Sequence, residues 1–120
     1  VVIGDAQKYL TCLITLKCVI SEDEIPTRIL EKSVCEFMKK LGSILVNTED
    51  ARTCNILKRY IEQGIVKANK NAVSNAQTVK KFRILLDDFS VSTDQLTPTL
   101  KLKRAIILEK NQNVIDELYA

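Results

Sequence analysis

The feature that most constrains the fold is an alternation of apolar side chains between Tyr9 and Ile20. Successive side chains of a β-strand point to opposite faces, so an apolar residue at every second position predicts a strand with one buried face. The wholly apolar face would be formed by Leu10, Cys12, Ile14, Leu16, Cys18 and Ile20. Such a strand belongs in a sheet whose apolar face is covered by another layer.

Two further segments predict strands beside it. Residues 1–3 are apolar, and residues 4–8 have the character of a hairpin connection. Residues 79–86 alternate again, with Phe82, Ile84 and Leu86 on one face and Lys81 and Arg83 on the other. The polar residues 21–27 and 87–95 are predicted to be loops.

Between these strands the apolar spacing becomes that of helices. Residues 28–41 carry an apolar stripe, with Thr27 as the predicted N-cap and Gly42 as the predicted terminator. A second helix is predicted to begin at Asn47-Thr48-Glu49-Asp50, where a capping residue precedes two acids. Its stripe consists of Leu57, Tyr60, Ile61, Gly64, Ile65, Ala68 and Ala72.

Gly64 is less favourable than Ala inside a helix by about 1 kcal/mol, so we expect close packing there. A last helix is predicted over residues 105–119, with Ile107, Ile115 and Leu118 on its apolar side. The element order is strand, strand, helix, helix, strand, short strand, helix. It predicts an α+β fold in which a small mixed sheet carries packed helices.

Composition limits the size and the partners of this fold. The 120 residues suffice for one small domain, residues 1–120, and the absence of Trp with 5% aromatics calls for an aliphatic core. The chain begins at Val1 inside an apolar run, so we expect it to be a piece of a larger protein. A net charge of +3 is too small to indicate nucleic-acid binding, and the three tyrosines are too scattered to form a stacking platform.

Four cysteines and no histidine occur, without a Cys-x-x-Cys pair, so no metal site is predicted. Cys12 and Cys18 would lie roughly 20 Å apart along a strand, too far for a disulfide. We interpret the thiols as small buried groups in a reducing compartment. No apolar run has the ~20 residues of a membrane span, so we expect a cytoplasmic protein, with any peripheral attachment to the endoplasmic reticulum or another organelle made through regions outside this chain.

The strongest chemical signal is the run from Leu96 to Arg104, where Lys101, Lys103 and Arg104 follow a proline-fixed turn at Pro98. An extended segment would put Thr99, Lys101 and Lys103 on one side and Leu100 and Leu102 on the other. Leucine neighbours would then hold Lys101 in place to grip a phosphate or a carboxylate. The competing interpretation is a solvated edge strand whose lysines discourage aggregation.

The sequence Thr97-Pro98-Thr99-Leu100-Lys101-Leu102-Lys103-Arg104 resembles the last signature motif of the adenylate-forming, AMP-binding superfamily. In the common form, Thr-x-Ser/Thr-Gly-Lys-Ile-x-Arg, the positions of Thr97, Thr99, Lys101 and Arg104 match, whereas Leu100 replaces Gly. The long-chain branch resembles this chain there too, with Leu-Thr-Pro-Thr-hydrophobic-Lys. Residues 1–5, 9–18 and 82–90 resemble bubblegum-type long-chain acyl-CoA synthetases.

The resemblance implies the C-terminal lid domain of such a synthetase, without its first hinge segment and inactive by itself. Its partners would be the larger N-terminal domain of the same chain, a fatty acid, ATP with Mg²⁺, and coenzyme A. Lys101 would be the catalytic lysine of acyl-adenylate formation. Residues near the nucleotide would support it, namely Thr97, Pro98, Thr99, Lys103 and Arg104. The lid would then rotate for thioester formation.

Two other hypotheses remain open from the residues alone. One is a non-catalytic interaction module that binds an anionic partner, such as a lipid headgroup, through its basic C-terminal strand. The other is a relative of the synthetases that keeps the fold without the activity. No Gly-rich phosphate loop, histidine base or paired nucleophile is present, so we expect this chain alone to catalyse nothing.

Overall fold

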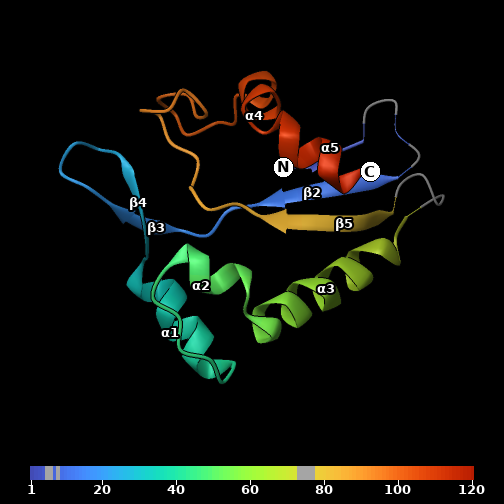
Figure 1. Ribbon diagram of the computed structural model, residues 1–120, viewed down its shortest axis with the longest axis horizontal. Coiled ribbons are helices and arrows are strands. Elements are labelled where there is room, and N and C mark those ends of the chain that lie inside the picture. The colour runs from blue at the N-terminus through green and yellow to red at the C-terminus, as the bar shows by residue number, and fades with distance from the viewer. Residues whose placement is uncertain (5–6, 8, 73–77) are drawn as a thin grey trace.

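A computed structural model describes residues 1–4, 7, 9–72 and 78–120, and it confirms the α+β class. Figure 1 shows the elements in this described part of the chain. The strands are β1 (Val2–Ile3), β2 (Leu10–Ile14), β3 (Cys18–Ile20), β4 (Pro26–Leu30) and β5 (Val79–Ile84). The helices are α1 (Lys32–Lys40), α2 (Thr48–Arg52), α3 (Asn55–Asn69), α4 (Arg104–Lys110) and α5 (Gln112–Leu118).

The main sheet has the strand order β1-β2-β5 and is mixed, as predicted. β1 runs antiparallel to β2, which agrees with the predicted hairpin, although Asp5, Ala6 and Lys8 of its connection lie outside the described residues. β5 runs parallel to β2. Parallel neighbours need a long crossover, and here it is the segment that contains α1, α2 and α3.

The prediction of one strand from Tyr9 to Ile20 was wrong. β2 ends at Ile14, and β3 pairs with β4 in a separate two-stranded sheet (Figure 1). The buried face of β2 is also the other one. Thr11 and Leu13 are buried, whereas Cys12 and Ile14 are only half-buried. The reason is that α4 and α5 cover the face of Leu13, forming a core with Ile3, Leu85, Ile107, Ile115 and Leu118.

The predicted helix over residues 28–41 begins later. Residues 26–30 pair with β3 as β4, and α1 starts at Lys32 after Glu31 in the N-cap position. Thr27 is therefore no N-cap, and its hydroxyl donates to the Val19 carbonyl at 2.6 Å. Gly42 terminates the helix as predicted, with φ of 93°, a left-handed conformation that glycine adopts without steric cost.

The second helix begins as predicted, because the Asn47 side chain accepts a hydrogen bond from the Asp50 N–H at 2.8 Å. It breaks after Arg52, however, and continues as α3 from Asn55. The expectation of close packing at Gly64 was wrong, since a Cβ placed there would have no heavy atom within 4 Å. The predicted stripe is only partly buried: Leu57 is buried, whereas Tyr60 is 47% exposed.

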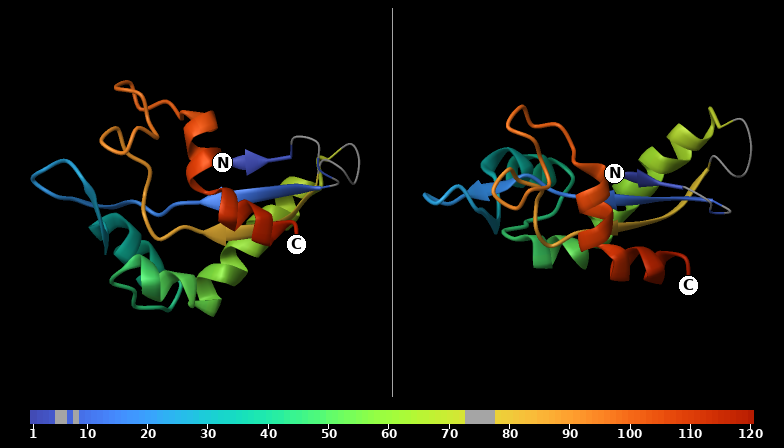
Figure 2. Two further views of the ribbon diagram at one scale, coloured as in Figure 1. Left: turned by 45° about the horizontal axis from the view of Figure 1, so that its top comes forward. Right: turned by 90° about the horizontal axis from the view of Figure 1, so that it is seen from above.

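The last helix is likewise divided, into α4 and α5 with Asn111 between them. The prediction that Ile107, Ile115 and Leu118 are its buried residues is confirmed. Figure 2 shows α3 and the α4–α5 pair on opposite sides of the β1-β2-β5 sheet. A second core joins α1, α2 and α3 to the strands and consists of Cys18, Leu30, Met38, Leu45, Ala51, Leu57 and Ile84. No described helix has the length and apolarity needed to cross a bilayer.

Candidate functional site

The basic run near the C-terminus forms a tight hairpin that leads into α4. Leu96 and Leu102 form an isolated antiparallel bridge, and the Lys103 N–H donates to the Gln95 carbonyl at 2.8 Å. Closer to the tip, the Thr97 N–H donates to the Lys101 carbonyl at 2.8 Å. We call residues 95–103 the lysine hairpin; it lies in the orange part of the chain in Figure 1.

The tip of the lysine hairpin is a turn centred on Pro98 and Thr99, closed by the Leu100 N–H donating to the Thr97 carbonyl at 2.8 Å. Leu100 then has φ of 63°, in the left-handed region. A turn followed by one left-handed residue is a standard three-residue hairpin loop, and glycine is preferred at that last position. The common superfamily motif has glycine there. A leucine in this conformation is strained by roughly 1–2 kcal/mol.

This conformation overturns the expected extended segment. The predicted alternation from Thr99 to Lys103 is interrupted because Leu100 is not in the β region. The leucines do not hold Lys101 either, since Leu100 is 70% exposed and Leu102 is 52% exposed.

Lys101 is held through its backbone instead. Its N–H donates to the Thr97 Oγ1 at 3.1 Å, and its carbonyl accepts from the Thr97 N–H. The Thr97 and Thr99 hydroxyl oxygens lie 3.0 Å apart. Thr97 thus fixes both the backbone N–H and the carbonyl of Lys101.

The three cations of the run have different surroundings. Lys103 forms an ion pair with Asp94, and the Arg104 guanidinium donates to the Val2 carbonyl at 2.7 Å, which ties the start of α4 to β1. The Lys101 ammonium is exposed and has no hydrogen-bond or ion-pair partner among the residues that the structure describes. Of the three, Lys101 is therefore the cation with its charge available to another molecule.

The loop that precedes the hairpin, residues 90–94, supports its base through hydrogen bonds. The Leu96 N–H donates to the Ser90 carbonyl at 3.0 Å, and the Ser90 and Thr93 hydroxyl oxygens lie 2.7 Å apart. The Thr93 hydroxyl also donates to the Gln95 side chain, and the Lys110 ammonium of α4 donates to the Thr93 carbonyl. Sequence reasoning predicted a polar loop here but not these contacts, because a Ser/Thr-rich run is typical of many turns.

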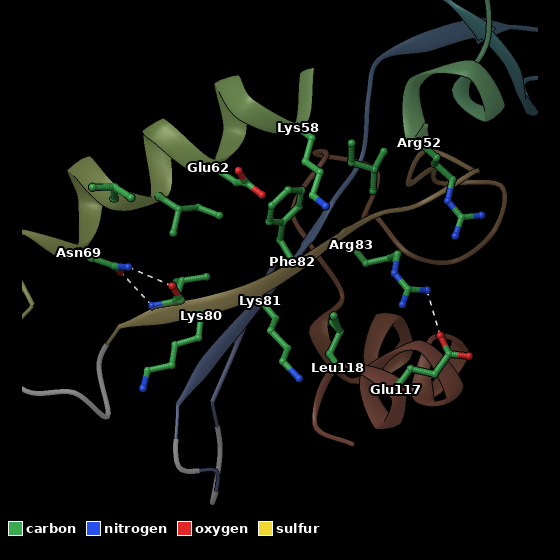
Figure 3. Close-up of a pocket in the computed structure, with 14 residues that line it drawn as sticks. Arg52, Lys58, Glu62, Asn69, Lys80, Lys81, Phe82, Arg83, Glu117 and Leu118 are labelled. Carbon is green, nitrogen blue, oxygen red and sulfur yellow. Dashed lines mark hydrogen bonds and ion pairs between the residues drawn. The ribbon is translucent and has the colours of Figure 1, made fainter. Parts of the chain in front are cut away.

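A second basic feature lies elsewhere, between α3 and β5, where a cavity of about 810 Å³ opens (Figure 3). We call it the basic groove. It is lined by the cations Arg52, Lys58, Lys80, Lys81 and Arg83 and by two carboxylates, Glu62 and Glu117. Lys80, Lys81 and Arg83 are close neighbours in the sequence, which therefore indicates a local basic excess. It did not indicate that Arg52 and Lys58 join them, because only the crossover of the sheet brings these residues together.

Several polar groups in the basic groove already have partners. Arg83 pairs with Glu117 at 3.0 Å, as Figure 3 shows. The Asn69 amide bonds to both backbone groups of Val79, donating at 3.0 Å and accepting at 2.9 Å. The Lys80 and Lys81 ammonium groups lie 6.0 and 5.9 Å from the centre of the Tyr9 ring. The groove is thus a broad, mixed surface, and none of the hairpin residues lines it.

The thiols differ in their titration. Burial raises the pKa of the Cys18 thiol to about 11, with a further contribution from the negative charges of Asp88 and Asp87. At Cys54 burial acts in the same direction, but the hydrogen bond with Ser43 and those from the backbone of α3 outweigh it and lower the pKa. Within the described ranges, no three His, Cys, Asp or Glu side chains come together as a metal site.

Comparison with known proteins gives consistent matches. The chain is 38% identical to the long-chain-fatty-acid–CoA ligase ACSBG1 of Bos taurus over 120 residues, and 39% identical to ACSBG2 of Gallus gallus over 121 residues. It is 37% identical to the long-chain-fatty-acid–CoA ligase heimdall of Drosophila melanogaster over 140 residues. Each match covers 98% of this chain. No family profile and no solved structure matches.

The chain spans only 16% of the two ACSBG relatives and 21% of heimdall. It is homologous to bubblegum-type long-chain-fatty-acid–CoA ligases, as the resemblance of its motifs predicted.

Proposed function

We propose that this chain, a homologue of the bubblegum-type ligases, is the mobile C-terminal lid of a long-chain fatty acid–CoA ligase and supplies Lys101 to acyl-adenylate formation. The observation that carries the proposal is the exposed Lys101 ammonium, unpaired in the described structure, on a hairpin whose backbone is fixed by Thr97. The reaction proposed for the complete protein would need such a fixed cation.

That reaction brings two anions together. The carboxylate oxygen of the fatty acid attacks the α-phosphorus of ATP, the bond to the β-phosphate breaks, and acyl-adenylate and pyrophosphate result. A lysine between the carboxylate and the α-phosphate offsets their repulsion and favours the in-line geometry. Mg²⁺ would neutralise charge on the departing phosphates, and its ligands would come from outside the described residues, which contain no carboxylate cluster for it.

In the second step the sulfur of coenzyme A attacks the acyl carbon, and AMP leaves with the electron pair of the acyl–oxygen bond. Lys101 must then withdraw so that the thiol can approach. A rigid-body rotation of the lid would do this. The hairpin would move with it as one unit, because its base is bonded to Ser90 and Thr93, and Thr93 is in turn bonded to Lys110 of α4. Arg104 and Lys103 support the hairpin through Val2 and Asp94 and have no direct role in this scheme.

The competing hypothesis of an interaction module that uses the basic strand has less support. Such a module would need several cations together, because one exposed lysine contributes only about 1 kcal/mol at an anionic surface. Lys103 and Arg104 are both engaged within the chain.

The test uses the complete protein from which this chain comes, assayed for CoA ligation with ATP and a long-chain fatty acid. The proposal expects acyl-CoA and AMP to form in equal amounts, each dependent on all three substrates. A complete protein that folds and binds vesicles of anionic lipid, yet turns over none of these substrates, would favour the interaction module instead.

A further inference from the structure

Apolar residues precede and follow Lys101 along the lysine hairpin. Pro98, Leu100 and Leu102 are all exposed, Leu100 by 70% and Leu102 by 52%. We call these three residues the apolar collar. An exposed leucine by itself is ordinary. Leu100 is unusual because it also occupies the left-handed position of the turn, with φ of 63°.

This combination is unfavourable for the chain as it stands. Glycine or asparagine would adopt the left-handed conformation more readily than leucine. Burial of the leucine side chain does not offset this strain, because most of its surface is exposed. A strained residue at a candidate functional site is a reason to look for a role outside the fold of the chain itself.

The relative lengths of the Leu100 and Lys101 side chains indicate where Leu100 would make contact with another part of the protein. Adjacent Cα atoms are about 3.8 Å apart, and a lysine side chain extends several ångströms further than a leucine. When the Lys101 ammonium reaches anions inside a cleft, Leu100 comes to rest at the mouth of that cleft. The apolar collar would therefore surround the stem of the lysine at the entrance.

Resting on the proposed function, we propose that the apolar collar seats on an apolar rim of the larger domain during adenylate formation and excludes water from the acyl-adenylate. The larger domain would be the binding partner of the collar, since the relatives are about six times as long as the matched segment, which is 16% of their length. The collar is uncharged, so its contact is apolar, while Lys101 passes through it to the anions.

The seal would decide whether the acyl-adenylate reacts with water or with coenzyme A. If water enters, its oxygen attacks the acyl carbon, the bond from that carbon to the phosphate oxygen breaks, and fatty acid, AMP and a proton are released. ATP is then consumed without acyl-CoA formation. A sealed site holds the acyl-adenylate until the lid rotates and the thiol of coenzyme A takes the acyl group.

The test compares Leu100→Gly and Leu100→Asn in the complete protein with wild type and with Ile20→Asn. Both Leu100 variants tolerate the left-handed turn, so neither is expected to unfold it. Ile20 is a matched control because it is an apolar residue, 64% exposed, on β3 and away from the hairpin. The measured quantity is the ratio of AMP released to acyl-CoA formed at low coenzyme A concentration.

We expect this ratio to rise about tenfold in both Leu100 variants, the order of effect of losing one buried leucine, and to stay at the wild-type value in Ile20→Asn. An unchanged ratio in both Leu100 variants overturns the inference, and so does an equal rise in Ile20→Asn. Loss of vesicle binding or of self-association at an unchanged ratio would also overturn it, and would assign the collar to lipid or to a second copy. Lys101→Ala, measured in parallel, should lower the rate of AMP formation by about 100- to 1,000-fold; a wild-type rate would mean that the proposed function itself fails.

Discussion

The lysine hairpin and the basic groove are both basic, yet they are built in opposite ways. The groove has five cations spread around a cavity of about 810 Å³, interleaved with two carboxylates and the Phe82 ring. The hairpin has one available cation, but two hydrogen bonds between Lys101 and Thr97 fix its backbone. Stabilising a transition state requires a charge at a defined position, so the number of cations matters less than the fixing of one of them.

The difference between the two regions is tested most strongly by removing one lysine from each of them in the complete protein. Lys101→Ala should lower the rate of CoA ligation by about 100- to 1,000-fold, as expected for loss of one preorganised charge. Lys81→Ala, in the groove, should change it less than about twofold because that ammonium is one of several on an open surface. Steady-state kcat/KM for the fatty acid measures both. Equal losses would mean that the hairpin has no special position.

Thr97 tests whether the backbone contact matters apart from the charge. Thr97→Val keeps the shape but removes the oxygen that accepts the Lys101 N–H, and we expect kcat for ligation to fall about 5- to 10-fold with little change in the KM for ATP. Thr97→Ser retains the hydroxyl and should behave like wild type. A full-length Thr97→Val enzyme with wild-type kcat would show that Lys101 needs no such support.

Substitutions at Leu100 and Gly42 compare a left-handed position that holds a strained leucine with one that holds an unstrained glycine. Leu100→Gly should raise the free energy of unfolding by about 1 kcal/mol, because glycine adopts the left-handed conformation freely. Gly42→Ala, at φ of 93°, should lower it by a similar amount, about 1 kcal/mol. Urea denaturation of the complete protein, followed through the transition of the lid, checks both; stabilisation by the second substitution would contradict the reasoning.

The smallest effect is expected at Lys103, whose partner is an exposed carboxylate. Lys103→Met should lower the free energy of unfolding by no more than about 0.5–1 kcal/mol, and the difference from wild type should shrink as salt is added. Activity should remain within about twofold of wild type, as for other surface pairs. A loss of ligation close to that of Lys101→Ala would instead give Lys103 a direct role at the nucleotide.

Local chemistry explains which elements could be predicted from the sequence. The cap at Asn47, the terminator at Gly42 and the alternation along β5 depend on neighbouring residues, and each was predicted. β4 was not, because its strand state arises from pairing with β3, whereas its spacing alone also fits a helix. The break between β2 and β3 was missed for the same reason, since the two strands belong to different sheets.

The candidate site divides in the same way. Lys101 could be identified because its motif is contiguous, and its role remains a prediction. Thr97 was predicted to support Lys101, but the hydrogen bonds by which it holds the lysine backbone were not, because a leucine in place of glycine conceals a left-handed residue and therefore a turn. The basic groove depends on residues from α2, α3 and β5 that only the crossover brings together.

The central claim is that Lys101 acts in one half of the reaction and not in the other. The most direct measurement compares pyrophosphate release from ATP and fatty acid with acyl-CoA formation from supplied acyl-adenylate, both in Lys101→Ala full-length protein. The account predicts that the first rate falls by about 100- to 1,000-fold while the second stays within about threefold of wild type. Equal loss in both half-reactions, or none in the first, would contradict it.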